Sequence, residues 1–270
     1  MVPSAREVDQ TGTERWSARS ACSTTAAPKA KRRPIWRRLA RLPAPGTCAT
    51  VESVEFTAHQ DQMALQRLRD QGGFNGDRIA DCALATVYAS GGDWLKVVVE
   101  KTDLSQSNLA GTRIREATFA HTALRKARLR GARLERVELY FCDLNEVDAS
   151  EVSARRTKVH GSEAMNAVFS GAQLAVTRFE DTKLYRARFD QALLVRVVFL
   201  DSRMGGPSLE KADFSGARLV DVTLRAANLQ GASFAGATLV GVDFTDAALE
   251  GADFRGAVAI GCRFPAGFSP

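Results

Sequence analysis

The chain has 270 residues, 45% of them hydrophobic, and a formal net charge of +6. No run of ~18 consecutive apolar residues occurs, so we expect no membrane-spanning helix. Residues 1–50 hold 10 basic and 3 acidic groups, and their net charge of +7 exceeds that of the whole chain. The rest of the molecule is therefore close to neutral, and an argument from basic charge to nucleic acid applies only to the N-terminal segment.

Residues 1–47 are expected to form a disordered basic tail, because Ser, Thr, Ala, Pro and charged residues dominate without a sustained period. Within this tail, segment 29–41 combines Trp36 and Leu39 with a cluster of arginines. Such a segment could touch nucleic acid, an acidic surface or a membrane, and the alternative is a leader without function. No apolar run follows the N-terminal charges, so we expect no secretory signal and a cytoplasmic protein.

Residues 48–78 are expected to cap whatever follows them. Thr57 and Gln60 fit a capping box, a short apolar stripe follows, and Gly72 with Gly73 ends the pattern. The sequence therefore predicts a short helix over 57–71 that covers one end of the main domain.

A period of five residues runs from 79 to 264. Every fifth residue from 104 to 264 is apolar, mostly Leu or Phe, and the residue two positions earlier is small, with Pro207 as the misfit. Neither a helix nor a strand has this period. A chain that turns a corner every five residues sends one large and one small side chain inward, and four such sides make a coil of about twenty residues. No insertion breaks the phase, so we expect no projecting loop; 265–270 is a short C-terminal end.

The segments ADFSG (212–216), ANLQG (227–231) and ADFRG (252–256) carry this pattern most plainly. They resemble the pentapeptide-repeat family. The resemblance implies an all-β fold, a right-handed four-sided parallel β-helix, in which residues twenty apart stack on one another. Ala149, Ala154 and Ala164 replace Leu or Phe at three inward corners, which predicts a narrowed or bent waist near 149–166.

We find no sign of catalysis. The three histidines lack metal-ligand spacing, and no nucleophile, zinc or phosphate-loop motif occurs. We therefore expect no enzyme, no cofactor and no metal. Cys82, Cys142 and Cys262 are separated by multiples of twenty in the small column, which predicts buried thiols on one side of the coil, too far apart for a disulfide.

Residues that should point outward form three candidate partner-binding groups. A basic stripe could bind phosphate or an acidic partner, although Glu116 and Glu135 within it favour a salt-bridged surface as the alternative. An acidic column could imitate spaced phosphates, or be neutralised by Lys183 and Arg203. An apolar group is larger than a monomer usually exposes and indicates a partner or dimer contact. The basic stripe is Arg113, Arg115, Arg133, Arg136, Arg155 and Arg156; the acidic column is Asp181, Asp201 and Asp221; the apolar group is Tyr140, Phe141, Val176, Leu193, Val195, Val198, Leu200, Val220, Val240 and Ile260.

Two functions remain open from the sequence. The resemblance implies a role like that of the family's bacterial members that bind DNA gyrase, a type II topoisomerase, and protect it from poisons or antibiotics by occupying or reshaping its DNA-binding saddle. Members that imitate DNA are acidic and some project loops, whereas this rod is near neutral. The alternative is a rigid scaffold for an unrelated protein partner, tethered by the basic tail. A homodimer through the C-terminal end is a further expectation.

Overall fold

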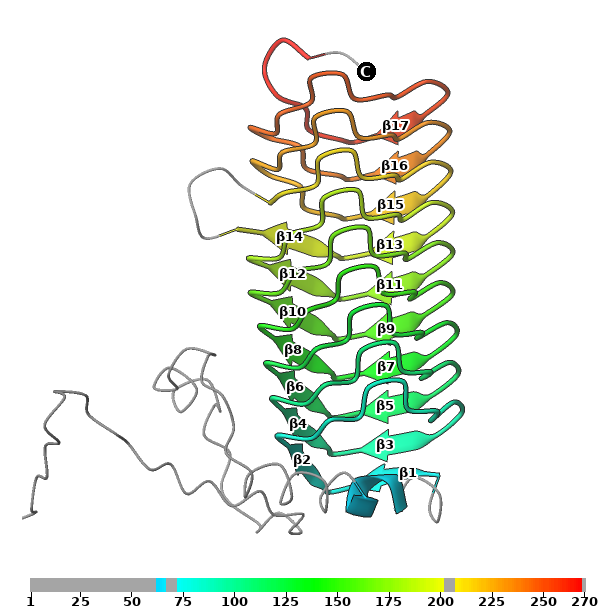
Figure 1. The fold of residues 1–270 in the computed structure, drawn as a ribbon. Helices are drawn as coiled ribbons and strands as arrows, with labels where there is room; N and C mark the ends of the chain where they lie inside the picture. The colour runs from blue at the N-terminus through cyan, green and yellow to red at the C-terminus, as the bar shows by residue number, and fades with distance from the viewer. Residues whose placement is uncertain (1–61, 67–71, 202–206, 269–270) are drawn as a thin grey trace, which may run out of the picture.

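The computed structural model describes residues 62–66, 72–201 and 207–268. The predicted tail, including 29–41, and most of the capping segment lie outside these ranges. Residues 62–66 are helical and lie at the β1 end of the rod (Figure 1). Ala64 is buried and Leu65 packs against the core, so this turn of helix covers inward-facing side chains of the first coil.

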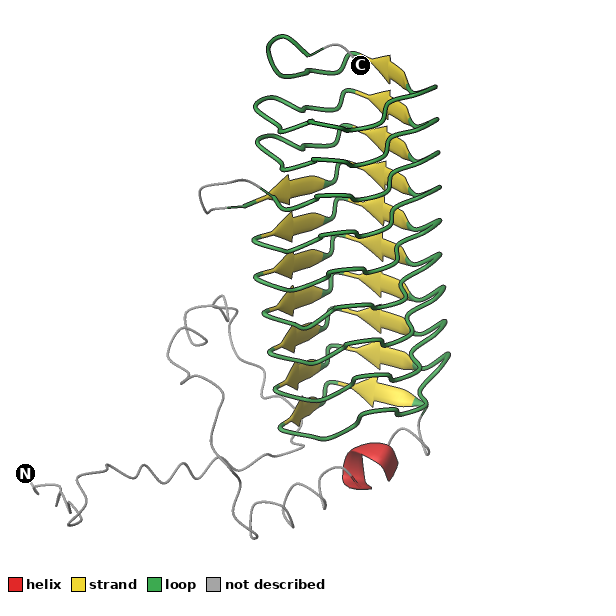
Figure 2. Ribbon diagram, turned by 45° about the horizontal axis from the view of Figure 1, so that its top comes forward, coloured by secondary structure: helices red, strands yellow, loops and turns green. Residues whose placement is uncertain are grey.

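The main body is a four-sided parallel β-helix, as expected, with two sides formed by continuous parallel sheets (Figures 1 and 2). Isolated parallel bridges connect successive coils on the other two sides. The ten-stranded face consists of β1 (Gly73–Asn75), β3 (Asp93–Leu95), β5 (Arg113–Arg115), β7 (Arg133–Glu135), β9 (Ser153–Arg155), β11 (Gln173–Ala175), β13 (Leu193–Val195), β15 (Arg218–Val220), β16 (Thr238–Val240) and β17 (Val258–Ile260). The seven-stranded face consists of β2 (Arg78–Ala80), β4 (Val98–Glu100), β6 (Thr118–Ala120), β8 (Glu138–Tyr140), β10 (Lys158–His160), β12 (Arg178–Glu180) and β14 (Val198–Leu200).

The repeat ADFSG shows why five residues make one side. Ala212 and Phe214 are both buried, so they supply the small and the large inward side chain. Asp213 accepts a hydrogen bond from the backbone N–H of Ser215 at 2.9 Å, which stabilises the turn next to the inward phenylalanine. Gly216 has a φ of 65°, in the left-handed region that glycine adopts without steric cost. The corner therefore falls at the fifth residue of the repeat.

Aromatic columns fill the upper part of the rod, which is the half toward the C-terminus. Phe189, Phe214, Phe234 and Phe254 stack on successive coils with ring centroids 4.8–5.0 Å apart. Burial of each such side chain contributes roughly 1.5–3 kcal/mol, against the entropy of ordering the chain. The phenylalanine excess of the sequence is thus explained by stacking along the axis.

One coil is longer than the others. Ala175 pairs with Val195 at an offset of 20 residues, but Val195 pairs with Val220 at an offset of 25. The phase of five is unbroken, but the expectation that every coil has twenty residues was wrong, because one complete extra pentapeptide keeps the phase while adding a side's length of chain. The extra residues fall between Leu200 and Ser208, in a region whose residues 202–206 are not described. Pro207, the misfit of the small column, is buried directly after them.

The extra pentapeptide moves every later residue by one side of the coil. The Cys142 Sγ lies 3.6 Å from the carbonyl oxygen of Phe119, on the seven-stranded face. The Cys262 Sγ lies 3.5 Å from the carbonyl oxygen of Leu239, on the ten-stranded face. The prediction that the cysteines share one side was therefore wrong for Cys262, although Cys82, Cys142 and Cys262 are all free thiols.

The predicted bend near 149–166 is also wrong. Ala154 pairs with Leu134 and Leu174 in the regular register, and the rod runs straight through this region (Figure 1). Backbone hydrogen bonds between coils set the path of the chain, so small inward side chains change the filling of the coil without changing its direction.

Candidate functional site

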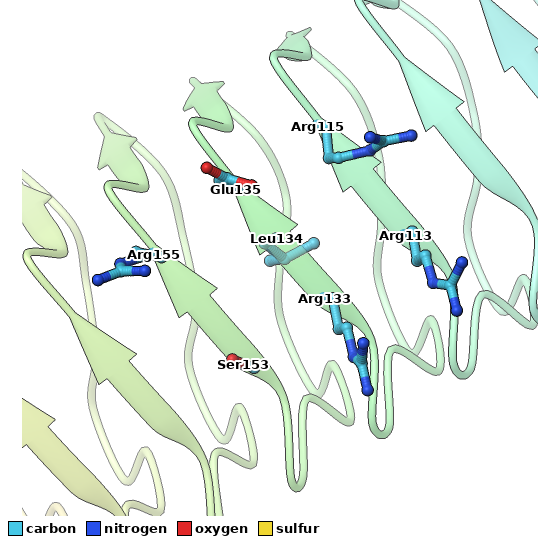
Figure 3. Close-up of a pocket in the computed structure, with 7 residues that line it drawn as sticks. All are labelled: Arg113, Arg115, Arg133, Leu134, Glu135, Ser153 and Arg155. Carbon is cyan, nitrogen blue, oxygen red and sulfur yellow. The ribbon is translucent and has the colours of Figure 1, made fainter.

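A basic groove lies across β5, β7 and β9 of the ten-stranded face. Arg113 pairs directly with Arg133 on the next coil, and Arg115, Glu135 and Arg155 stack in the neighbouring column. The groove has a volume of about 440 Å³ and is lined by Arg113, Arg115, Arg133, Leu134, Glu135, Ser153 and Arg155 (Figure 3). The structure thus brings four of the six predicted arginines together.

The arginines of this stripe differ in their partners. Arg115 donates two hydrogen bonds to the carboxylate of Asp93, at 2.9 and 3.0 Å. Arg136 lies outside the groove and pairs with Glu135 at 3.2 Å and Glu116 at 3.6 Å, as the salt-bridge alternative predicted. Arg156 is exposed at a corner outside the groove.

The other three arginines of the stripe line the groove, where Glu135 is the direct strand neighbour of Arg155. Arg113, Arg133 and Arg155 are exposed and make no ion pair within the described part of the chain. Like charges held this close repel one another, and an anion between them removes that repulsion. Guanidinium groups also offer paired donors that match carboxylate and phosphate oxygens.

Apolar side chains cover the upper half of the same face. Val195, Val220 and Val240 follow one another in the outward column of β13, β15 and β16. Ile260, which is 58% exposed, continues this column on β17, and Leu193 and Val258, which are 37% and 53% exposed, lie in the neighbouring outward column. Val258 was missed by the sequence analysis, although its place between the inward positions 257 and 259 makes it outward; only its face depends on the length of the long coil. The ten-stranded face is therefore basic in its lower half, and its upper half carries this apolar column beside a mixed column that also holds Arg218 and Thr238.

The remaining residues of the predicted apolar group lie elsewhere. Tyr140, Val198 and Leu200 belong to β8 and β14 of the seven-stranded face. Phe141 and Val176 occupy exposed corners with left-handed backbone, and Phe141 stacks on His121 with ring centroids 5.3 Å apart. The predicted group is thus split between two faces and their corners.

The predicted column of three aspartates does not form. Asp181 and Asp201 occupy equivalent positions on successive coils, but Asp221 follows Arg196 across the long coil. The carboxylate of Asp181 lies 3.9 Å from Nδ1 of His160. Lys183 pairs with Glu163 at 2.7 Å, and Arg203 lies outside the described residues.

Charges on the seven-stranded face neutralise one another. Glu180 accepts from Lys158 at 2.6 Å and from Arg178 at 2.8 Å. Burial opposes the ionised form of Glu180, but these two hydrogen bonds outweigh it and lower the pKa of the carboxyl group. The contrast with Arg113, Arg133 and Arg155 singles out the ten-stranded face as the candidate site.

The groove offers guanidinium donors, one carboxylate and one hydroxyl, which is the chemistry of anion recognition. Among the described residues, no three His, Cys, Asp or Glu side chains are grouped to hold a metal ion. The described part of the chain also contains no helix long and apolar enough to cross a membrane.

The sequence was compared with models of known protein families and with curated protein sequences. The family model described as pentapeptide repeats matches in 8 copies, over residues 97–131, 182–221, 208–246, 217–256 and 239–264. No curated protein sequence matches the chain significantly.

Among solved structures, HetL, a pentapeptide repeat protein involved in heterocyst differentiation regulation from the cyanobacterium Nostoc sp. strain PCC 7120, is 24% identical. The match covers 73% of this chain and 95% of HetL, with a TM-score of 0.43. QnrB1, a plasmid-mediated fluoroquinolone resistance protein, is 20% identical in a trypsin-treated variant form, over 69% of this chain and 91% of QnrB1, with a TM-score of 0.38. With its five-residue sides, four-sided coils and matched repeats, the chain belongs to the pentapeptide-repeat family.

Proposed function

We propose that this chain is a non-enzymatic binding protein that docks a protein partner on its ten-stranded face. This proposal rests on one observation: a basic groove and an apolar strip lie on the same sheet. Three groove arginines, which make no ion pair in the described part of the chain, are separated by the single strand β11 from an apolar strip that runs from Leu193 to Ile260. The complementary partner surface presents carboxylates opposite the groove and apolar side chains opposite the strip.

The architecture suits such a role. Parallel sheets are usually covered on both sides, whereas the outer side of this sheet carries no further layer in the described chain (Figure 2). Its side chains stand on strands held by hydrogen bonds between coils, so binding requires little ordering of the backbone. The rigid sheet therefore favours affinity, because little conformational entropy is lost on binding.

A type II DNA topoisomerase, DNA gyrase, is the first partner to test, with protection from a poison or antibiotic in the cytoplasm as the activity. Family membership supports it. The arginines of the groove are opposite in sign to the phosphates of DNA. The proposed contact is therefore with an acidic protein surface, rather than imitation of DNA along the whole rod.

The test is gyrase supercoiling with and without a poison, in the presence of the full-length protein. We expect relief of poisoning, or inhibition of supercoiling at higher protein concentration. Val220→Asp places a charge in the apolar strip and should abolish the effect. Val198→Asp lies on the seven-stranded face and should preserve it. The two substitutions are matched, since both valines are half-buried and point outward. No effect of the wild type on either reaction would reject a topoisomerase partner.

A scaffold for an unrelated acidic partner is the second candidate, and the basic groove on an otherwise near-neutral rod favours it. In this case the basic tail would act as a tether to nucleic acid or an acidic surface, and the C-terminal end as a dimer contact. A pull-down that compares residues 1–270 with 48–270 tests the tether. Specific capture of the same partner by both forms would show that the tail is dispensable.

A further inference from the structure

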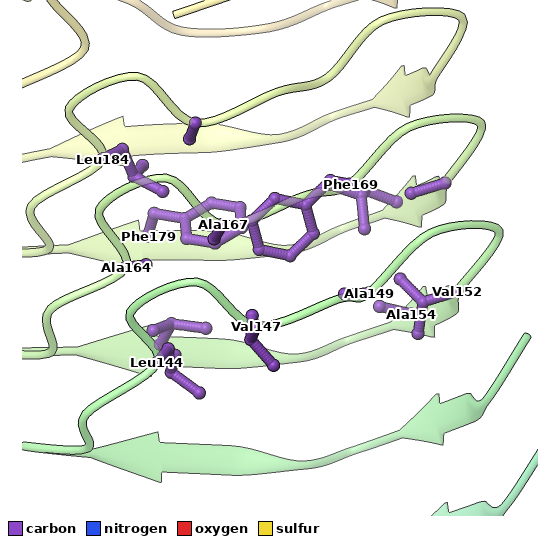
Figure 4. Packing of buried hydrophobic residues seen from close by; sticks show 14 of the residues in the cluster. Leu144, Val147, Ala149, Val152, Ala154, Ala164, Ala167, Phe169, Phe179 and Leu184 are labelled. Atoms are coloured by element: carbon purple, nitrogen blue, oxygen red, sulfur yellow. The ribbon is translucent and has the colours of Figure 1, made fainter. Parts of the chain in front are cut away.

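One coil of the rod has a thin core. Its inward corners hold Ala149, Ala154, Val159 and Ala164. The equivalent corners of the next coil hold two phenylalanines and two leucines, namely Phe169, Leu174, Phe179 and Leu184. In Figure 4 the short side chains of Ala149 and Ala154 lie in the coil below the rings of Phe169 and Phe179. Each Leu-to-Ala difference removes about three carbon groups from the axis, and a core relaxes only in part around such a loss.

The side chains around the thin coil keep more accessible surface than inward side chains higher in the rod. Inward residues in the upper rod, such as Phe234 and Leu239, are 0% exposed. Around the thin coil the values rise: Leu129 and Phe169 are 8% exposed and Leu139 is 7%. Protein interiors are normally packed without voids of this kind.

The space lies inside the rod. Leu139 projects from the seven-stranded face and Leu129 from a third side. Both occupy inward corners, so the volume that they share is the axis of the rod. A crevice on one outer face would expose only one of these columns.

The lining is mainly apolar. Two polar side chains of the thin coil point inward: the Thr157 hydroxyl is buried without a hydrogen-bond partner, and the buried Ser162 hydroxyl donates to the carbonyl oxygen of His160 at 3.1 Å. An ordered water needs two to four polar partners, whereas cavities of about 150 Å³ lined by Leu, Ile and Phe stay dry and accept xenon or benzene. We infer that the thin coil encloses an apolar cavity that binds a small apolar molecule of the size of xenon.

The cavity lies directly behind the basic groove. Leu134 lines the groove and also faces the thin coil, and Ala154 stands between Ser153 and Arg155 of β9. The binding site is nevertheless independent of the proposed partner, because its ligand enters the axis and touches no outward side chain.

Methyl-detected NMR of the full-length protein under xenon pressure tests the inference. The methyl resonances of Leu129, Leu139 and Val159 should shift and saturate with xenon. Those of Leu219 and Leu239, which are 0% exposed in the upper core, should not move. Equal small shifts at all these methyl groups, or none, would overturn the inference; a cavity filled by water would give this result.

A filling substitution provides the second arm. Ala154→Leu should remove the xenon shifts and raise the melting temperature by a few degrees, since it restores the missing contacts. Ala175→Leu, on the next strand but pointing outward, is the matched control and should leave the xenon shifts in place. If Ala154→Leu does not fold, the saturable shifts of the wild type still decide between a cavity and a packed core.

Discussion

Val195 and Val220 are direct neighbours on adjacent parallel strands, although 25 residues separate them. At a uniform spacing of twenty, Val220 would follow Leu200 on the seven-stranded face. The extra pentapeptide instead carries Val220, Val240 and Ile260 onto the ten-stranded face. One insertion of five residues thus builds the apolar strip beside the arginine groove.

Deletion of residues 202–206 should leave the rod folded. The shortened coil would have the length of its neighbours, and the pairing of Val195 with Val220 would survive. Because loop length affects closure entropy only weakly, we expect the free energy of unfolding to change by less than about 1 kcal/mol. Urea unfolding followed by circular dichroism measures it. Deletion of 227–231, which removes buried Ala227 and Leu229 from a regular coil, is the control and should be strongly destabilising. Equal losses of unfolding free energy in the two deletion variants would contradict the presence of one longer coil.

Reversal of charge in the groove should weaken binding to polyanions. The double variant Arg113→Glu, Arg133→Glu removes two guanidinium groups that lack ion pairs in the described chain, and we expect about tenfold weaker binding to heparin, which corresponds to ~1.4 kcal/mol. Elution from a heparin column in a salt gradient reports the change. The control is Arg125→Glu with Arg130→Glu, two arginines engaged by Asp143 and Glu151. An equal shift of both variants would assign the binding to overall charge or to the tail.

Truncation of the aromatic column should cost far more than truncation at the surface. Phe234 is 0% exposed and stacks on Phe214 and Phe254, with centroids 4.9 and 4.8 Å away. Phe234→Ala should lower the free energy of unfolding by about 3–5 kcal/mol, because the column cannot close over the gap. Phe141→Ala, at a corner where the ring is 48% exposed, should cost less than about 1 kcal/mol. Chemical denaturation distinguishes the two, and similar losses would show that the column is not the main support.

The thiol of Cys142 should resist alkylation and make stability depend on alkaline pH. Burial raises the pKa of Cys142 from 9.0 to about 12. Between these values the unfolded chain releases the proton while the folded chain keeps it, so the stabilising contribution is complete below pH 9 and lost as the pH rises toward 12. Cys142→Ala should flatten this decline in urea unfolding.

Peptide mass spectrometry after brief treatment with iodoacetamide gives the second measurement for the thiols. Cys142 should stay unlabelled in the folded protein, and the half-buried Cys262 should react faster. Equal labelling of both cysteines in the folded state would contradict the burial of Cys142.

Sequence reasoning succeeded wherever the argument stayed within one pentapeptide or one run of regular coils. It predicted the inward corners, and it predicted that Arg113 and Arg133 lie side by side, because both belong to coils of twenty residues. It failed at Asp221 and Cys262, which lie beyond the long coil. The pairing of Arg115 with Asp93 also had to come from the structure, since a one-letter pattern does not show which carboxylate a long side chain reaches.

The sequence by itself determined the side, the corner and the core: a large residue, a small residue and a left-handed fifth position define each wall of the rod. Only the tertiary structure decided how many walls each coil contains, and therefore which outer residues share a face. The reason is physical. Burial constrains the inward positions of every pentapeptide alike, so an extra pentapeptide leaves the pattern intact, while hydrogen bonds between β13 and β15 reveal which strands are neighbours.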